Sequence, residues 1–540
     1  MPRNIYSKTK RIIAYLTCAC ALSVACATSE TRGASFNWEK CGAQKDGTYH
    51  NPVLPADFSD LDCIRVSDDY YAISSTMHFS PGMVVLHSRD LVNWRIIGHA
   101  VGDLAQIGPA LNWDKMGRYG RGVWAGSIRF HNNKYYVFFG TPDEGYFMTT
   151  ADNPAGPWAP LHPLMREAGW DDCSAIWDDN GQAWFVGTQF SKGYKTYLFK
   201  MSADGRAIDR ESATLIHEGA GREANKLIKH DGFYYLVYSE NTPPEGRYVL
   251  ARRAEKMTGP WSEPRKLSHG DRDAREPNQG GIIQGPDGAW YFFTHHGSGA
   301  WEGRCASLTP VTWMDGWPVL GKPDENGVGH FVWSGKLPAP DSVAAVREPQ
   351  ASDSFDSPAL APQWEWNYQP RAGFWSLTER PGWLRLRAFP PLKPNALMQA
   401  GNTLTQRAWR TAANTVVIKL DLSGMADGQH AGLCHFARAH SALGIVQSGA
   451  TRQIEFRVND KITSGPEISA TTIWLRSTWG ADGLSRYAYS LDGKNYHETG
   501  EPYQLAWGNY RGDRVGIYNY NNNGERGYVD VDYFEYDFSK

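Results

Sequence analysis

A pair of adjacent aromatic residues recurs along the first part of the chain, each time after a polar turn and within a strand-like run. The second aromatics of the five pairs are 65, 49, 50 and 56 residues apart. The pairs are Tyr70-Tyr71, Tyr135-Tyr136, Trp184-Phe185, Tyr234-Tyr235 and Trp290-Tyr291. A period of about fifty residues with strand content is typical of β-propeller blades of four strands. The spacing therefore predicts a five-bladed β-propeller over residues 45–333.

After residue 333 the chain loses this period. Residues 334–352 include Pro338, Pro340 and Pro349 among small and polar residues, a composition typical of a linker. From residue 353 to 540 alternating apolar strands resume, and no long stretch has helical apolar spacing. We therefore expect an all-β chain in which the propeller is followed by a linker and a β-sandwich domain over residues 353–540.

The first 27 residues are predicted to be an export signal. A basic opening over residues 3–11 precedes the uncharged apolar stretch 12–27, which is too short to span a bilayer comfortably. We expect cleavage after Ala27 and a secreted or periplasmic protein, with lipid attachment at Cys26 as the weaker alternative. No later segment reaches membrane-spanning length.

Charge and cysteine content restrict the other classes of function. The chain carries 55 Lys and Arg against 58 Asp and Glu, a net charge of -3, so it has no basic field for nucleic acid. Five scattered cysteines remain after the signal: Cys41, Cys63, Cys173, Cys305 and Cys434. They form neither a disulfide framework nor a metal cluster, although a bridge from Cys41 to Cys63 stays open.

Three acidic segments precede the aromatic pair of their predicted blades. They are Asp57 to Asp62, Asp171 to Asp179, and Glu223. Asp and Asn often cap turns, and we expect this of Asp57, Asp178 and Asp179. Three acids at equivalent blade positions indicate instead a catalytic centre on the propeller axis, where the innermost strands deliver their side chains.

These segments resemble glycoside hydrolase family 43, over nearly the whole mature chain. Residues 51–55, Ser59-Asp60, 64–71 and 87–94 resemble the first blade of that family. Residues 510–520 and 527–534 resemble the concanavalin-like, lectin-type sandwich of its β-xylosidase and α-L-arabinofuranosidase type members. The resemblance implies that this sandwich packs on the propeller and shapes the rim of the pocket.

The resemblance also implies the catalytic roles. Asp60 corresponds to the general base, Glu223 to the general acid, and Asp172 to the residue that tunes the pKa of the acid and orients it. An inverting glycosidase needs a base and a protonated acid about 6.5 to 9.5 Å apart, and a third acid nearby raises the pKa of the proton donor. Asp62 stays an alternative base, and alternating strand geometry lets only one of Asp171 and Asp172 face the axis.

Four further residues are predicted to contact the sugar. Trp124 is expected to form a wall of the pocket, and Met77 stands where xylosidase-like members carry Phe. Arg304 and His295 resemble the sugar-binding Arg and axial His of the family, although Arg304 could pair locally with Glu302. No cofactor is expected to be required. His295 is a candidate ligand for a structural calcium on the axis.

The sequence therefore predicts an exo-acting, inverting glycosidase that releases terminal α-L-arabinofuranose or β-D-xylose from hemicellulose oligosaccharides. Two alternatives remain: an exo-glycosidase for another sugar such as galactose, and a carbohydrate-binding propeller without catalysis. An oligosaccharide or polysaccharide is the expected partner, and the oligomeric state is not predicted.

Overall fold

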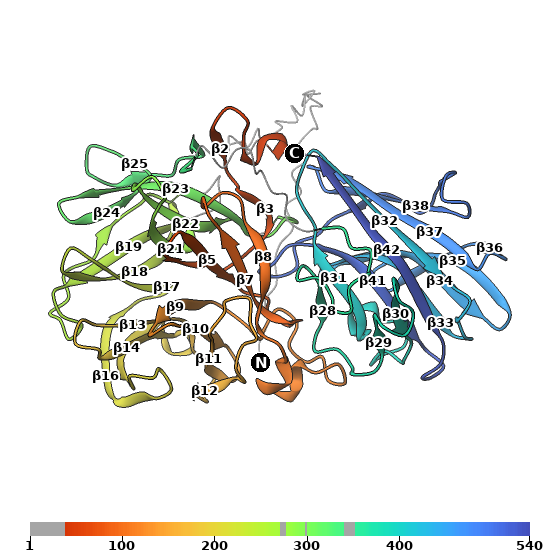
Figure 1. Cartoon of the computed structure of the whole chain (residues 1–540), viewed down its shortest axis with the longest axis horizontal. Coiled ribbons are helices and arrows are strands. Elements are labelled where there is room, and N and C mark those ends of the chain that lie inside the picture. The colour runs from red at the N-terminus through yellow and green to blue at the C-terminus, as the bar shows by residue number, and fades with distance from the viewer. Residues whose placement is uncertain (1–37, 271–276, 298–299, 340–350, 540) are drawn as a thin grey trace, which may run out of the picture.

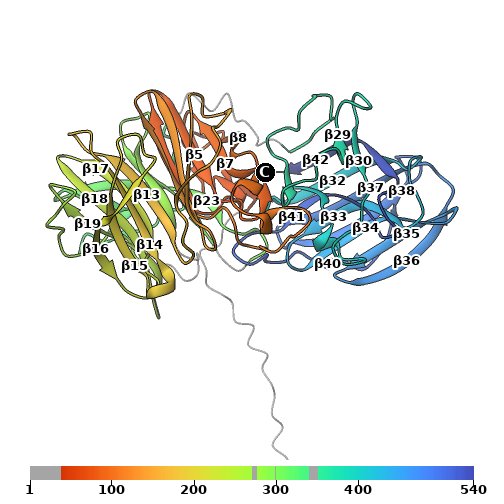
Figure 2. The same cartoon turned by 90° about the horizontal axis from the view of Figure 1, so that it is seen from below.

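A computed structural model of the chain describes residues 38–270, 277–297, 300–339 and 351–539. Within these residues the regular structure is almost entirely β-strand, arranged in two lobes that lie side by side (Figures 1 and 2). The predicted signal, residues 1–27, lies outside the described part. In that part, no helix is both long and apolar enough to cross a membrane.

The N-terminal lobe contains antiparallel sheets that follow one another along the chain. Four of the described sheets have four strands each: β4 (Asp62–Val66), β5 (Asp69–Ser74), β7 (Gly82–Ser88) and β8 (Arg95–Val101); β9 (Gly126–His131), β10 (Lys134–Thr141), β11 (Gly145–Ala151) and β12 (His162–Met165); β13 (Asp171–Trp177), β14 (Ala183–Gln189), β15 (Lys195–Met201) and β16 (Ile208–Glu218); β17 (Glu223–His230), β18 (Phe233–Thr242), β19 (Gly246–Ala254) and β20 (Arg265–Lys266). A fifth contains β21 (Asn278–Gln284), β22 (Trp290–His296), β23 (Cys305–Met314), β24 (Trp317–Leu320) and the early strand β3 (Leu54–Asp57), which pairs with β23.

Each aromatic pair lies in the second strand of one of these sheets, namely β5, β10, β14, β18 and β22. Successive residues of a strand point to opposite faces, so a pair can pack against both neighbouring sheets at once. Tyr234 packs with Trp184 of the preceding sheet, whereas Tyr235 packs with Phe292 of the following sheet. The recurring pair is therefore the packing unit that joins successive sheets.

The first strands of the five sheets pack against one another in chain order. β4 contacts β9, β9 contacts β13, β13 contacts β17 and β17 contacts β21, and β21 contacts β4 in turn. Residues at the start of each of these strands therefore converge, although they are far apart in sequence.

The C-terminal lobe is built from two large antiparallel sheets, as the predicted sandwich requires. One has the order β36 (Lys461–Ile468), β35 (Thr451–Val458), β34 (His440–Ser448), β33 (Gln429–Phe436), β41 (Arg514–Asn521), β31 (Asn402–Arg407), β28 (Glu365–Asn367) and β6 (Phe79–Ser80). The other has the order β29 (Trp375–Ser376), β30 (Leu384–Arg387), β42 (Tyr528–Ser539), β32 (Ala413–Asp421), β37 (Thr472–Gly480), β38 (Leu484–Ser490) and β39 (His497–Glu498), with β40 (Tyr503–Gln504) beside β38. In β32, Val416, Ile418 and Leu420 are fully buried and alternate with partly exposed residues, because one face of the strand packs on the other sheet.

Short elements complete the described fold. The remaining strands are β1 (Gly42–Ala43), β2 (Thr48–His50), β25 (Lys322–Pro323), β26 (Gly329–His330) and β27 (Ser334–Lys336), and the 3-10 turns are η1 (Trp38–Lys40), η2 (Leu104–Gln106), η3 (Pro109–Leu111), η4 (Phe190–Lys192) and η6 (Leu397–Gln399). β27 pairs with β2, so the first residues of the predicted linker form a strand, and residues 340–350 of that linker lie outside the described chain. Cys41 and Cys63 are both buried and form no disulfide with each other, so the bridge between them that the sequence left open is wrong.

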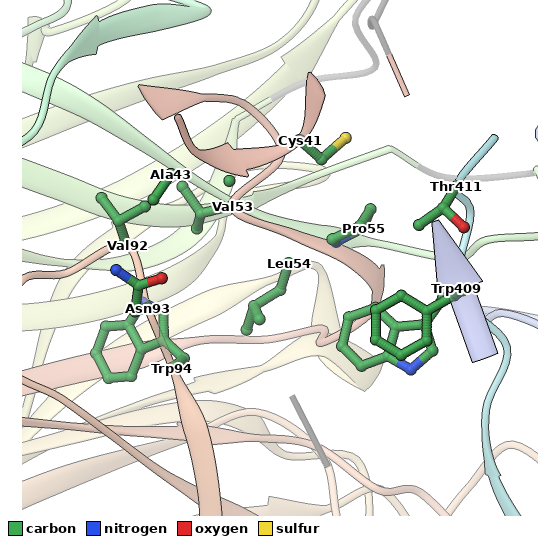
Figure 3. Close-up of a pocket in the computed structure, with 12 residues that line it drawn as sticks. Cys41, Ala43, Val53, Leu54, Pro55, Val92, Asn93, Trp94, Trp409 and Thr411 are labelled. Atoms are coloured by element: carbon green, nitrogen blue, oxygen red, sulfur yellow. The ribbon is translucent and has the colours of Figure 1, made fainter. Parts of the chain in front are cut away.

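The two lobes are joined by backbone pairing as well as by side chains. β6, which comes from the N-terminal part of the chain, pairs with β28 of the sandwich. Gly303 and Gly512 approach so closely that a Cβ on Gly303 would lie 2.5 Å from the Gly512 nitrogen. A cavity of only about 20 Å³ lies at this junction, and its lining includes Leu54 and Pro55 of one lobe and Trp409 of the other (Figure 3). That cavity is too small for a sugar, so its lining serves packing between the lobes.

Candidate active site

A cavity of about 370 Å³ opens at the starts of the first strands of the N-terminal lobe. This volume falls within the range of small-molecule sites. The cavity is lined by Asp60, Met77, Tyr119, Gly120, Arg121, Trp124, Ala125, Asp171, Asp172, Phe190, Tyr194, Glu223, Asn278, Gln279, Arg304, Asn509 and Tyr510. The three acids predicted to act together, Asp60, Asp172 and Glu223, are thus brought to one cavity from three different sheets.

Asp60 lies just before β4, and three contacts hold it in place. Its Oδ2 accepts a hydrogen bond from the Ser75 hydroxyl at 2.8 Å, and its Oδ1 forms an ion pair with the Arg304 guanidinium at 2.9 Å. Its backbone N–H donates to Nδ1 of His295 at 2.8 Å. The carboxylate is therefore fixed in orientation, while one edge still lines the cavity.

Asp62, the alternative base, is engaged elsewhere. Its Oδ2 accepts the backbone N–H of Ile128 at 3.0 Å and pairs with the Arg129 guanidinium at 2.6 Å. It does not line the cavity. Asp178 accepts the backbone N–H groups of Asn180 and Gln182, which is the turn-capping role expected of it.

Asp171 and Asp172 both line the cavity, so the expectation that only one of them could face the site is wrong. The pairing register between β13 and β14 shifts between Asp171 and Ser174. Asp172 also adopts a positive φ of 43°. A bulge of this kind adds a residue to one strand and breaks the side-chain alternation on which the expectation rested.

Both carboxyl groups favour the protonated form. Burial, followed by the negative charges of Glu223 and Asp60, raises the pKa of Asp172 to about 7. Burial and the neighbouring Asp172 raise the pKa of Asp171 well above its usual value. Burial and like charge both disfavour an ionised carboxylate, so this cluster retains protons at a pH where exposed carboxyl groups have lost them.

Glu223 begins β17, and its side chain is 21% exposed. Its Oε1 forms an ion pair with the guanidinium of Arg247 at 3.0 Å. The next residue, Ala224, donates its backbone N–H to Oδ2 of Asp172 in a short hydrogen bond. Asp172 therefore holds the backbone beside Glu223.

A register shift beside a residue with positive φ recurs in three sheets around the cavity. Register shifts occur in the first strands β13, β17 and β21, next to Asp172, Ala224 and Gln279. These three residues have positive φ values of 43°, 68° and 50°. A positive φ is costly for a residue with a side chain, and such strain is concentrated where a site needs side chains turned in a particular direction.

Three of the four predicted sugar contacts line the cavity, and one does not. Trp124, Met77 and Arg304 are in the lining, and Glu302 pairs with Arg410 rather than with Arg304. His295 lies behind Asp60. Burial, followed by Arg304, holds the pKa of His295 well below its usual range, so its ring is neutral and accepts the Asp60 N–H.

The described residues around His295 do not provide the ligands that the expected calcium site would need. Calcium takes six to eight oxygen ligands, whereas His295 offers nitrogen, and its Nδ1 is occupied by the Asp60 N–H. Among the described residues, His295 belongs to no group of three or more His, Cys, Asp or Glu ligand atoms. No step of the chemistry is therefore assigned to calcium.

The C-terminal lobe completes the cavity with Asn509 and Tyr510, which sequence reasoning did not name as site residues. The Arg304 guanidinium lies over the Tyr510 ring at 5.4 Å. The segment is fixed because the N–H of Asp513 donates to the Trp301 carbonyl at 2.6 Å. The signal in the sequence for these residues was the family-like motif that begins at Tyr510. The position of Tyr510 in the cavity lining confirms that this lobe contributes to the rim.

The other lining residues that sequence reasoning missed include Tyr119, Arg121, Phe190, Tyr194, Asn278 and Gln279. None belongs to a short motif, so a sequence without spatial neighbours gives no signal for them. The cavity gathers carboxylates from three sheets together with arginines and aromatic rings, which is the set of groups that a glycosidase needs.

Comparison with known proteins shows which glycosidase family the chain belongs to. Residues 49–318 match the family model described as Glycosyl hydrolases family 43, and residues 352–537 match the model described as Beta xylosidase C-terminal Concanavalin A-like domain. The chain belongs to glycosyl hydrolase family 43.

Relatives with reported activities and structures are similar over most of the chain. The sequence is 34% identical to a beta-xylosidase of Formosa agariphila, over 92% of this chain and 91% of that protein. It is 30% identical to a non-reducing end alpha-L-arabinofuranosidase of Bacteroides ovatus, over 64% of this chain and 65% of that protein. A solved bifunctional GH43-CE protein of Bacteroides eggerthii has a TM-score of 0.79 at 29% identity, covering 93% of this chain and 64% of that longer chain.

Proposed function

We propose that this protein is an exo-acting, inverting glycosidase that releases a terminal pentose, α-L-arabinofuranose or β-D-xylose, from hemicellulose oligosaccharides. The observation that carries the proposal is the convergence of Asp60, Asp172 and Glu223 on one cavity. The beta-xylosidase and alpha-L-arabinofuranosidase relatives support the choice of a pentose.

In the proposed reaction, Asp60 is the general base. It takes a proton from the water that attacks the anomeric carbon, and Ser75 and Arg304 keep its carboxylate aimed at the cavity. Glu223 is the general acid and protonates the oxygen of the departing group, so that one glycosidic bond is replaced by one bond to water. Direct attack by water inverts the configuration of that carbon.

Asp172 is proposed to keep Glu223 in its acidic form and in position. Burial and like charge raise the pKa values of Asp171 and Asp172, so these two carboxyl groups retain protons that isolated carboxyl groups would lose. Asp172 also accepts the backbone N–H of Ala224, next to Glu223. The Glu223 carboxyl group pairs with Arg247 and is partly exposed, so solvent can reach it to replace a proton given to the substrate.

The exo mode follows from the shape of the cavity. Its sides come from Trp124 and Phe190 of the N-terminal lobe, and Tyr510 of the other lobe covers its rim. A pocket closed in this way accepts a chain end more readily than the middle of a polymer. An exo-glycosidase for another sugar and a binding-only propeller are the competing functions.

The finer architecture belongs to the same proposal. The five consecutive sheets, whose first strands pack in a closed sequence, support a five-bladed propeller over residues 45–333, followed by a linker to residue 352 and a sandwich from 353 to 540. We expect the protein to be exported after loss of residues 1–27, to act as a secreted or periplasmic enzyme, and to need no cofactor.

The test measures hydrolysis of aryl α-L-arabinofuranoside and aryl β-D-xyloside by the wild type and by the variants Glu223→Gln and Asp60→Asn. Loss of an acid or a base is expected to reduce kcat/KM about a hundredfold or more. Asp68→Asn is the control, because that side chain is 92% exposed and lies outside the cavity.

Proton NMR of the first-formed sugar distinguishes the stereochemical outcomes, since inversion of a β-xyloside gives α-xylose first. Full activity in both variants would overturn the assigned roles. No hydrolysis of either substrate by the wild type would favour another sugar or the binding-only function.

A further inference from the structure

A group of side chains with metal-binding chemistry lies outside the catalytic cavity. One ligand atom each from His269, Asp324 and His330 lies within 4.8 Å of the other two. None of these residues lines the cavity, and the hairpin of β25 and β26 that carries two of them lies on the side of the N-terminal lobe away from the C-terminal lobe (Figure 1).

The backbone brings these residues together. His269 follows β20, and its N–H donates to the Gly329 carbonyl at 2.8 Å, next to His330. Asp324 opens the turn between β25 and β26, and its Oδ1 accepts the N–H groups of Asn326 and Val328, both at 2.9 Å. Its second oxygen, Oδ2, is directed at Nε2 of His269 at 2.9 Å.

Carboxylates lie at both nitrogens of the His269 ring. Glu245 Oε1 is 3.4 Å from Nδ1, and Asp324 Oδ2 is 2.9 Å from Nε2. Nitrogen and carboxylate oxygen are ligand atoms that divalent transition metals bind, and here Nε2 of His269 and Oδ2 of Asp324 lie next to each other.

His330 supplies the third ligand atom of the group. Its ring is stacked on the His269 ring, with centroids 4.4 Å apart and planes 20° apart. His330 is exposed, so its ring has room to reorient towards a metal held by His269 and Asp324.

We propose that His269, Asp324 and His330 form a surface site for Zn²⁺. Two imidazole nitrogens and one carboxylate oxygen are ligands that zinc prefers, and a tetrahedral site leaves the fourth position to water. Glu245 Oε1 lies 3.4 Å from the other ring nitrogen of His269, where a carboxylate can orient a zinc-bound histidine. Glu245 is itself held by the Gly270 N–H at 2.9 Å. Bound zinc would fasten the β25–β26 hairpin to the edge of β20.

The test is a calorimetric titration of metal-free, full-length protein with Zn²⁺, followed by X-ray absorption of the loaded sample. We expect one equivalent per chain, with zinc–nitrogen distances of about 2.0 to 2.1 Å. His330→Ala and Asp324→Ala should each weaken binding at least tenfold, and Glu245→Gln by about ten to a hundredfold. His497→Ala, an exposed histidine of the other lobe, is the matched control and should bind as the wild type does.

Thermal melting adds a second readout. Zinc should raise the Tm of the wild type and of His497→Ala but not that of His330→Ala. Circular dichroism of the metal-free variants verifies that they are folded. Absence of zinc binding in the wild type would overturn the proposal, as would binding that persists unchanged in His330→Ala and Asp324→Ala. Hydrolysis of aryl glycosides should be the same in all these variants.

Discussion

The buried carboxyl groups of the cavity and Glu365 at the interface between the lobes have pKa values that are shifted in opposite directions. In the cavity, burial and mutual repulsion raise the pKa values of Asp171 and Asp172. At the interface between the lobes, burial alone would raise the pKa of Glu365, but Arg407, Arg514 and His99 outweigh it and hold the pKa well below its usual range.

The difference comes from the neighbours and not from the depth of burial. Glu365 is fully buried, and its two oxygens pair with Arg407 at 2.9 Å and with Arg514 at 2.6 Å. His99, from β8 of the N-terminal lobe, reaches the same carboxylate at 3.3 Å. The interface thus balances its charges and joins the lobes, whereas the cavity gathers like charges whose repulsion serves proton transfer.

The largest expected effect is at the interface. Glu365→Gln keeps the size of the side chain but leaves two buried guanidinium groups without their counter-charge. Removal of one partner from such a cluster should lower the free energy of unfolding by about 3–5 kcal/mol. Denaturant unfolding measures it, with Glu525→Gln as the control because that glutamate pairs with Arg371 on the surface. Equal stability of both variants would contradict the comparison.

A second, smaller effect should appear in the pH dependence of stability. The folded-state pKa of Asp172 is raised to about 7 from 3.8, so the folded protein binds more protons than the unfolded chain between these values. Stability therefore falls across that window as pH rises. Asp172→Asn removes this penalty, and its Tm should exceed that of the wild type at pH 8 by at least about 2 °C.

Glu365 gives the opposite sign. Its folded-state pKa is lowered, so its contribution is present above the unfolded value of about 4.5 and is lost as pH falls below it. At pH 8 the Tm of Asp172→Asn should be higher than that of the wild type, and the Tm of Glu365→Gln should be lower. Both differences should become smaller as the pH is lowered. Differences of the same sign at pH 8 would contradict the assignment of the two regions.

The smallest expected effect is at the rim. Tyr510 is 53% exposed and contacts Arg304 through its ring face. Tyr510→Ala should raise KM for aryl glycosides about two- to fivefold, since an exposed cation–π contact is worth about 0.5–1 kcal/mol. The Tm should stay within about 1 °C of the wild type. Leu491→Ala, another exposed apolar residue of this lobe, is the control and should leave KM unchanged.

Much of the fold could be predicted because it is encoded locally. The aromatic pairs mark the second strand of each sheet, since two adjacent residues of a strand pack on two neighbouring sheets. Apolar alternation over residues 353–540 predicted sandwich strands in the same way, and β32 (Ala413–Asp421) has this pattern of burial. Short-range patterns of this kind depend on the chain itself and need no knowledge of distant neighbours.

The site could be predicted only in part. Asp60, Asp172 and Glu223 stood in recognisable motifs, and all three line the cavity. The presence of both Asp171 and Asp172 in the lining and the position of His295 behind Asp60 were not predictable. The motif at residues 510–520 predicted that the other lobe shapes the rim, but not that Tyr510 itself lines the cavity. Each of these features depends on contacts between residues far apart in sequence.

Periodicity, alternation and motifs are properties of the linear chain, so they were enough to predict the strand repeat, the β-structure of both lobes and the candidate acids. Which carboxyl groups share a cavity and which face arginines depends on the folded structure. A bulge next to Asp172, Ala224 or Gln279 turns side chains by changing backbone pairing across a sheet. A pKa depends on charges that only folding brings within a few ångströms.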